Sequence, residues 1–122
     1  MKSALRNKLS ALVQRRIRAE RRNCKRVVPA QRALCLLQAP GEDPPTTGHV
    51  QDLSLKGVSV VVEREVPSGA QVEVRLVNAS HTFLVARGLK VVRCLRVGFG
   101  QYFVAGPFDY PLAHDEVVPF ML

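Results

Sequence analysis

The sequence predicts an all-β domain, a small antiparallel barrel of six or seven strands. From residue 48 onward, short apolar runs alternate with turn residues, which is typical of small barrels and sandwiches. Residues 71–77 place Val or Leu at every second position, the pattern of a half-buried strand. The chain has 122 residues, enough for one domain with a core and too few for two.

Turn residues divide the barrel region into separate strands. The expected strands are residues 33–38, 49–53, 58–63, 71–77, 82–96 and 101–104. Residues 82–96 are too many for one flat strand, so we expect a bend or bulge at Gly88. Residues 39–47 are polar and proline-rich and predict a loop. Between Pro111 and Pro119 only a short helix fits, over residues 113–118.

A basic helix is expected before the barrel, over residues 3–20, with Ser3 as its cap. Its apolar stripe consists of Leu5, Leu9, Leu12 and Val13. Three interpretations stay open: the helix packs on its own domain or on a second copy, it lies on a membrane surface, or it is solvated. Residues 21–31 should be extended, because Pro29 disfavours the helical conformation before it.

We therefore divide the chain into a basic amphipathic segment, residues 1–20, and a β-barrel domain with its tail, residues 21–122.

The positive charge is concentrated at the start of the chain. Residues 1–26 hold ten Lys and Arg and one Glu, whereas residues 27–122 hold eight Lys and Arg against nine Asp and Glu. A cationic segment on a nearly neutral body indicates an anionic partner that is met at one end.

Several classes of protein are not indicated. The sequence has neither an apolar run of eighteen residues nor a signal-peptide pattern, so we expect a cytoplasmic location. Its three cysteines are an odd number without metal-ligand spacing, so neither a disulfide framework nor a metal cofactor is expected. Without a recognisable catalytic motif, we expect the chain to be no enzyme by itself.

Two short motifs carry chemistry that suits a nucleotide. Arg22-x-x-x-Arg26 offers two planar guanidinium groups, which match phosphate oxygens and the O6/N7 edge of guanine. Asp52-x-Ser54-x-x-Gly57 places an acceptor, a hydroxyl and a glycine at a turn between two expected strands. By itself, the arginine motif is more often a solvated or nucleic-acid-facing basic surface. The Asp-x-Ser motif by itself more often serves only to hydrogen-bond its own turn.

Together, in this order and β-rich context, the two motifs resemble those of the PilZ domain, the bacterial receptor module for cyclic di-GMP. The resemblance covers roughly residues 21–104 and implies a PilZ-type barrel whose ligand and allosteric effector is cyclic di-GMP. It also implies a regulatory role in second-messenger signalling.

The resemblance further implies a role for each residue of the motifs. Arg22 and Arg26 would clamp guanine and phosphate, Asp52 would accept from guanine N–H groups, and Ser54 would hydrogen-bond guanine or phosphate. Lys56 would add a phosphate contact, and Gly57 would let the backbone turn tightly beside the ligand. The implied site residues are Arg21, Arg22, Arg26, Asp52, Ser54, Lys56 and Gly57. Arg21 lies directly before the first motif. An arginine at this position resembles family members that bind an intercalated dimer of the ligand.

The basic segment that runs directly into the arginine motif is similar to the regulatory region of bacterial cellulose synthase catalytic subunits, at the cytoplasmic face of the inner membrane. The alternative to such a regulatory region is a stand-alone PilZ adaptor that acts on a separate effector protein. One alternative function is a nucleic-acid-binding β-barrel with a basic arm. It is disfavoured, and no nucleic acid is expected, because the barrel is not basic and has few aromatic residues. Another is a protein that self-associates or docks on a membrane through its N-terminal helix.

Overall fold

The computed structural model describes residues 26–29 and 32–121. The expected helix over residues 3–20 lies outside these ranges. The described part contains seven strands. They are β1 (Leu34–Gln38), β2 (Thr46–Leu53), β3 (Gly57–Val62), β4 (Gln71–Val77), β5 (Leu84–Lys90), β6 (Arg93–Gly98) and β7 (Gln101–Pro107). The all-β prediction is confirmed, and of the six or seven strands expected, seven are observed.

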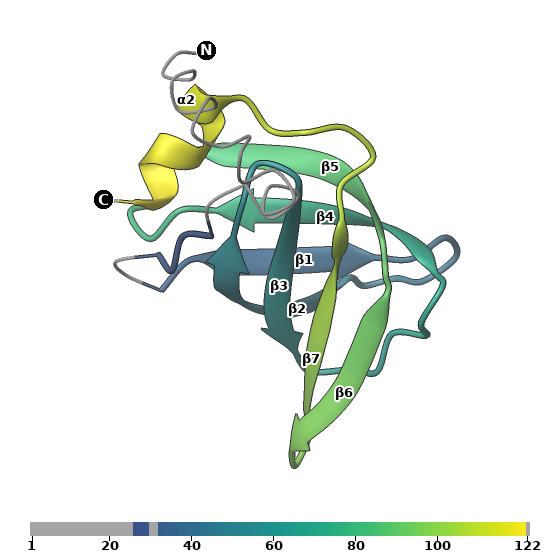
Figure 1. Cartoon of the computed structure of the whole chain (residues 1–122). Coiled ribbons are helices and arrows are strands. Elements are labelled where there is room, and N and C mark those ends of the chain that lie inside the picture. The colour runs from purple at the N-terminus through teal and green to yellow at the C-terminus, as the bar shows by residue number, and fades with distance from the viewer. Residues whose placement is uncertain (1–25, 30–31, 122) are drawn as a thin grey trace.

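All seven strands form one antiparallel sheet in the order β5-β4-β1-β2-β3-β7-β6. The sheet curls into a half-barrel (Figure 1). The β5 end of the sheet approaches the segment just after β7, where Phe108 forms an antiparallel bridge with Leu89 of β5. A Cβ at Gly106 would lie 1.9 Å from the Lys90 carbonyl oxygen, so glycine is needed for this approach.

The core fills the concave side of the sheet. Val72, Val74 and Leu76 of β4 are buried, whereas Gln71 and Glu73 are exposed, as the period-two pattern predicts. Val58, Val60 and Val62 contribute the matching face of β3. Cys35 of β1 lies in the same core, and burial raises the pKa of its thiol to about 12. Burial of these aliphatic side chains is the main force that stabilises the fold.

Two expectations about the strands need correction. The long run over residues 82–96 breaks at Val91 and Val92, between β5 and β6, and not at Gly88. Gly88 pairs with Glu73 in an uninterrupted register. Its missing side chain leaves room for Asp109, because a Cβ there would lie 1.9 Å from the Asp109 carboxylate. In addition, β2 begins at Thr46, inside the expected loop.

The tail after β7 folds back onto the barrel. It forms α2 (His114–Val117) and the 3-10 turn η3 (Val118–Phe120), which confirms the short C-terminal helix. Phe120 is buried, and its ring meets the Phe83 ring edge-on with centroids 6.1 Å apart. Arg87 of β5 donates to Glu116 Oε1 over 2.7 Å. None of the helices in the described part of the chain is long and apolar enough to cross a bilayer.

Candidate ligand-binding site

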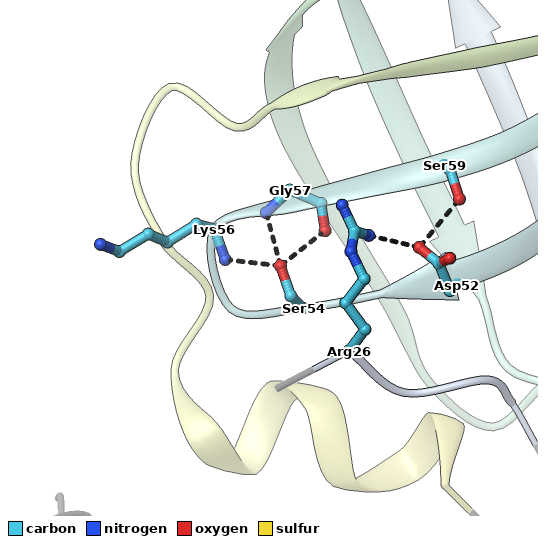
Figure 2. Close-up of polar contacts among 6 residues, drawn as sticks. All are labelled: Arg26, Asp52, Ser54, Lys56, Gly57 and Ser59. Carbon is cyan, nitrogen blue, oxygen red and sulfur yellow. Dashed lines mark hydrogen bonds and ion pairs between the residues drawn. The ribbon is translucent and has the colours of Figure 1, made fainter. Parts of the chain in front are cut away.

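The turn between β2 and β3 carries the second motif (Figure 2). Asp52 comes to this turn through a bulge in β2, because the register with β3 shifts between Val50 and Asp52. The bulge lets Val50 and Leu53 both point into the core, since one extra residue resets the alternation of side chains. Asp52 then lies directly opposite Ser59 of β3.

Ser54 holds the turn together from inside. Its buried hydroxyl accepts hydrogen bonds from the backbone N–H groups of Lys56 (3.3 Å) and Gly57 (3.2 Å). It also lies 3.3 Å from the Gly57 carbonyl oxygen, to which it donates. The backbone N–H of Ser54 donates to the same carbonyl over 2.9 Å. The Ser54 hydroxyl is therefore used within the turn, and its structural effect is to fix the path from Asp52 to β3.

Gly57 is required for packing and not for a left-handed turn. It is absent from the residues with positive φ and pairs with Pro107 of β7. A Cβ at Gly57 would lie 2.6 Å from the Gly106 carbonyl oxygen. The absence of a side chain therefore lets β7 approach the motif turn. The expected tight approach of Gly57 to a ligand stays a prediction, and the structure adds this close approach of two backbones.

Arg26 is held beside Asp52 by its neighbour in the chain. Val27 forms an antiparallel bridge with Leu53, in which Val27 N–H donates over 2.6 Å and Leu53 N–H over 2.8 Å. The bridge places the Arg26 guanidinium against Asp52, where its Nη1 donates to Asp52 Oδ1 (Figure 2). Residues that are 26 positions apart in the sequence thus form one ion pair.

The Arg26–Asp52 pair remains accessible to a ligand. The side chains of Arg26 and Asp52 are 58% and 28% exposed. Asp52 Oδ1 also accepts from Ser59 Oγ over 2.8 Å, while Oδ2 accepts no hydrogen bond from the residues that the structure describes. The pair therefore presents donors and an acceptor side by side, an arrangement that complements the edge of a guanine base or a phosphate with a neighbouring N–H.

The tail after β7 supports the motif turn from behind. Phe108 N–H donates to the Lys56 carbonyl over 2.8 Å, and Leu112 N–H donates to the Leu55 carbonyl over 2.7 Å. Phe108 and Leu112 are themselves buried. These two hydrogen bonds fix the turn from the side opposite to Asp52. This contact was not expected from the sequence, because single hydrogen bonds from irregular backbone leave no pattern of residue types.

The remaining expected site residues fall into two groups. Lys56 is exposed, and its side chain points away from the Arg26–Asp52 pair (Figure 2). Arg21 and Arg22 lie outside the described residues.

Ser59 was not expected from the sequence. Its only signal was a polar residue within the apolar run of β3, two positions after Gly57. Within residues 26–29 and 32–121, no cluster of three potential ligands could hold a metal ion.

The fold and the site define a small β-barrel domain with a polar, partly exposed site at the turn between β2 and β3. A profile of the PilZ domain family matches residues 20–107, which is most of the chain and includes both motifs. The chain belongs to the PilZ domain family. No curated protein matches the chain.

Solved structures share this fold. The structure of Bacillus subtilis inhibitor of motility (MotI/DgrA) superposes with a TM-score of 0.59 at 14% identity, over 79% of this chain and 47% of that one. MrkH of K. pneumonia in its apo state gives 0.59 at 14% identity, over 78% and 46%. The PilZ domain of YcgR from Escherichia coli, solved with c-di-GMP, gives 0.57 at 15% identity, over 82% and 86%. The chain spans about half the length of the first two proteins.

Proposed function

We propose that the chain is a cyclic di-GMP receptor and regulatory module, without catalytic activity of its own. The observation that carries this proposal is the contact between Arg26 and Asp52, which brings the two separate motifs into one exposed site. Membership of the PilZ domain family supports it. So does the likeness to the YcgR domain, whose structure was solved with c-di-GMP.

The ligand is an anionic ring with two guanine bases, so its site must offer cations and acceptors together. Arg26 supplies a guanidinium to phosphate or to the guanine O6/N7 edge. Asp52 accepts from the guanine N–H groups, and the hydrogen bond from Ser59 orients its carboxylate. Arg22, four residues before Arg26 in the chain, supplies the second guanidinium.

We assign different parts to the other motif residues. Ser54 acts through the shape of the turn, because its hydroxyl is committed to backbone groups. Gly57 acts through the close approach of β7. Lys56 attracts the phosphates at longer range, since its side chain points away from the pair. Arg21 lies on a guanine face of a second ligand molecule, so that an intercalated dimer binds.

The decisive experiment is isothermal titration calorimetry of the whole chain with cyclic di-GMP. We expect micromolar or tighter binding, and we expect Arg22→Ala, Arg26→Ala and Asp52→Ala each to weaken it at least about tenfold, since a charge-assisted hydrogen bond contributes about 1.5–3 kcal/mol. The matched control is Arg75→Ala. Arg75 also pairs with a carboxylate, Glu73, but on β4 and away from the motifs. Arg21→Ala should change the stoichiometry from two ligands per chain to one.

GTP and a short RNA complete the experiment. GTP should not replace cyclic di-GMP, because it carries a single guanine. A chain that releases no heat with cyclic di-GMP but binds RNA with a steep dependence on salt would overturn the proposal, and would favour a nucleic-acid-binding barrel with a basic arm.

What the receptor regulates is a separate proposal. The basic segment that runs directly into Arg22 supports a membrane-associated glycosyltransferase of the cellulose synthase type, as its own regulatory region or as a partner. Membranes from the source cells should then show cyclic di-GMP-dependent glucosyl transfer that the Asp52→Ala change abolishes. Transfer that is unaffected by this change would indicate a different effector protein.

A further inference from the structure

The hairpin formed by β6 and β7 exposes apolar side chains that the barrel does not use. Phe99 at its apex is 95% exposed, and Leu95 and Val97 of β6 are 48% and 55% exposed. Figure 1 shows this hairpin projecting beyond the rest of the sheet. Contiguous exposed apolar side chains of this size mark an interaction surface.

The same hairpin is cationic. Residues 90–101 contain Lys90, Arg93 and Arg96 and no acidic residue. Arg93 lies over the ring of Phe103, with its guanidinium carbon 5.7 Å from the ring centroid. The side chain of Arg96 is directed towards the apex, where its Nε lies 3.4 Å from the Gly98 carbonyl oxygen. Apolar and positive groups therefore share one projecting edge.

The edge of β6 lies at one end of the sheet, and no strand covers it among the residues that the structure describes. Glu63 and Glu65 follow β3, which pairs with β7 and not with β6. They therefore leave the β6 edge itself positive. An anionic partner complements this edge, whereas a neutral or cationic one does not.

We propose that the β6–β7 hairpin is a docking element for anionic lipid surfaces. Phe99 inserts into the interfacial region of the bilayer, with Leu95 and Val97 following it, while Arg93 and Arg96 bind the lipid headgroups. The two neighbours of Phe99 are glycines, so the apex is narrow and carries a single large side chain. The Arg96 side chain is directed towards this apex, so its guanidinium lies where it can bind headgroups beside the inserted ring.

A second copy of the chain fits this edge less well. Antiparallel pairing of two β6 strands would bring together two edges that each carry Arg93 and Arg96 and no acidic residue. The two copies therefore offer each other no complementary charge. A convex apex with one aromatic residue also suits a fluid interface, which needs no preformed pocket. The proposal concerns a surface separate from the Arg26–Asp52 pair and does not rest on the proposed ligand.

The chain contains no Trp, so Phe99→Trp introduces a single fluorescent reporter at the apex. The whole chain carrying this change is mixed with vesicles of equal parts phosphatidylcholine and phosphatidylglycerol. We expect the Trp emission to shift to the blue and to become protected from a soluble quencher. Leu84→Trp is the matched control, because Leu84 is also exposed, at 57%, but lies on β5 at the opposite end of the sheet. Its emission should not change.

The basic residues 1–26 could hold the chain on anionic vesicles without the hairpin, and the reporter distinguishes the two cases. Sedimentation of the Phe99→Trp chain with vesicles while its indole emission stays unchanged would overturn the proposal, as would the absence of sedimentation. Vesicles of phosphatidylcholine alone should give no shift; an equal shift with them would overturn the role of charge.

Affinity for the mixed vesicles provides the second measurement. Phe99→Ser should weaken it about tenfold or more, because the apolar transfer of a Phe side chain is lost. Arg93→Gln combined with Arg96→Gln should weaken it about thirtyfold, since each basic residue near an anionic surface contributes about a fivefold factor. Arg75→Gln removes one positive charge away from the hairpin and is the control; it should lose far less than the factor of about five for one hairpin arginine, because its side chain already pairs with Glu73. Equal losses in the control would contradict a specific role for the hairpin.

Discussion

Asp52 shows how a single side chain acquires its position. The sequence places it in a motif, but the bulge at the end of β2, the bridge of Val27 and the hydroxyl of Ser59 determine what it contacts. The Arg26–Asp52 pair is partly exposed to solvent, and ion pairs near the surface contribute only about 0–1 kcal/mol to stability. The pair therefore adds little to the stability of the fold, which agrees with the ligand-binding role proposed for it.

Ser54→Ala tests the structural role of the hydroxyl. We expect the ligand-free protein to lose about 1–3 kcal/mol of unfolding free energy, because the buried Gly57 N–H and the partly buried Lys56 N–H lose their acceptor. Urea denaturation followed by circular dichroism measures this loss. Asp52→Asn, in the same motif but only partly buried, should lose less than about 1 kcal/mol. An unchanged stability in Ser54→Ala would mean that the hydroxyl serves the ligand alone.

His49 of β2 makes the stability depend on pH. Burial, and secondly the positive charge of Arg32, lower the pKa of this imidazole in the folded state. The unfolded chain therefore binds a proton at a higher pH, so this contribution is present above the unfolded pKa of about 6.5 and is lost as the pH falls from there through the lower folded pKa. We expect His49→Gln to show a smaller loss of stability than the natural chain between about pH 8 and pH 5. Identical pH profiles would contradict the assignment.

At the scale of elements, the motif turn depends on what packs behind it. β7 approaches at Gly57, and the tail after Pro107 donates to the carbonyls of Leu55 and Lys56. The tail is in turn attached to β5, where Arg87 pairs with Glu116 and lies over the Tyr110 ring. The position of Asp52 is thus linked to elements that contribute no residue to the proposed site.

Gly57→Ala tests the contact between the turn and β7. The new methyl group would lie 2.6 Å from a backbone carbonyl oxygen, so the strands must separate, at a cost of about 1–3 kcal/mol. We expect a lower denaturation midpoint together with weaker cyclic di-GMP binding. Gly98→Ala is the control, because the atom nearest to its Cβ belongs to the flexible Gln101 side chain. Equal losses in the two variants would show that the close approach at Gly57 is not special.

At the scale of the whole molecule, charge and fold are separate. The near-neutral barrel carries the described part of the site, while most of the positive charge precedes it. Under the proposed division at residue 20, the barrel folds without the basic first segment.

Removing residues 1–18 tests this division. The shortened chain loses six of its Lys and Arg but keeps Arg21, Arg22 and Arg26. We expect its unfolding midpoint and its affinity for cyclic di-GMP to change little. Its retention on a cation-exchange column should fall. Light scattering before and after the removal shows whether the segment also joins two copies. A shortened chain that fails to fold would contradict the division.

The sequence by itself determined the β-rich fold, the alternation of β4, the short C-terminal helix and the family, through Arg22-x-x-x-Arg26 and Asp52-x-Ser54-x-x-Gly57. These features are local, because residue types and their spacing reflect burial and turn chemistry within a few positions. Only the tertiary structure decided that Ser54 serves the turn, that Gly57 and Gly88 make room for other segments, and that Ser59 and the tail support the site. These roles arise from contacts between distant segments, and a residue's type does not reveal which backbone will approach it.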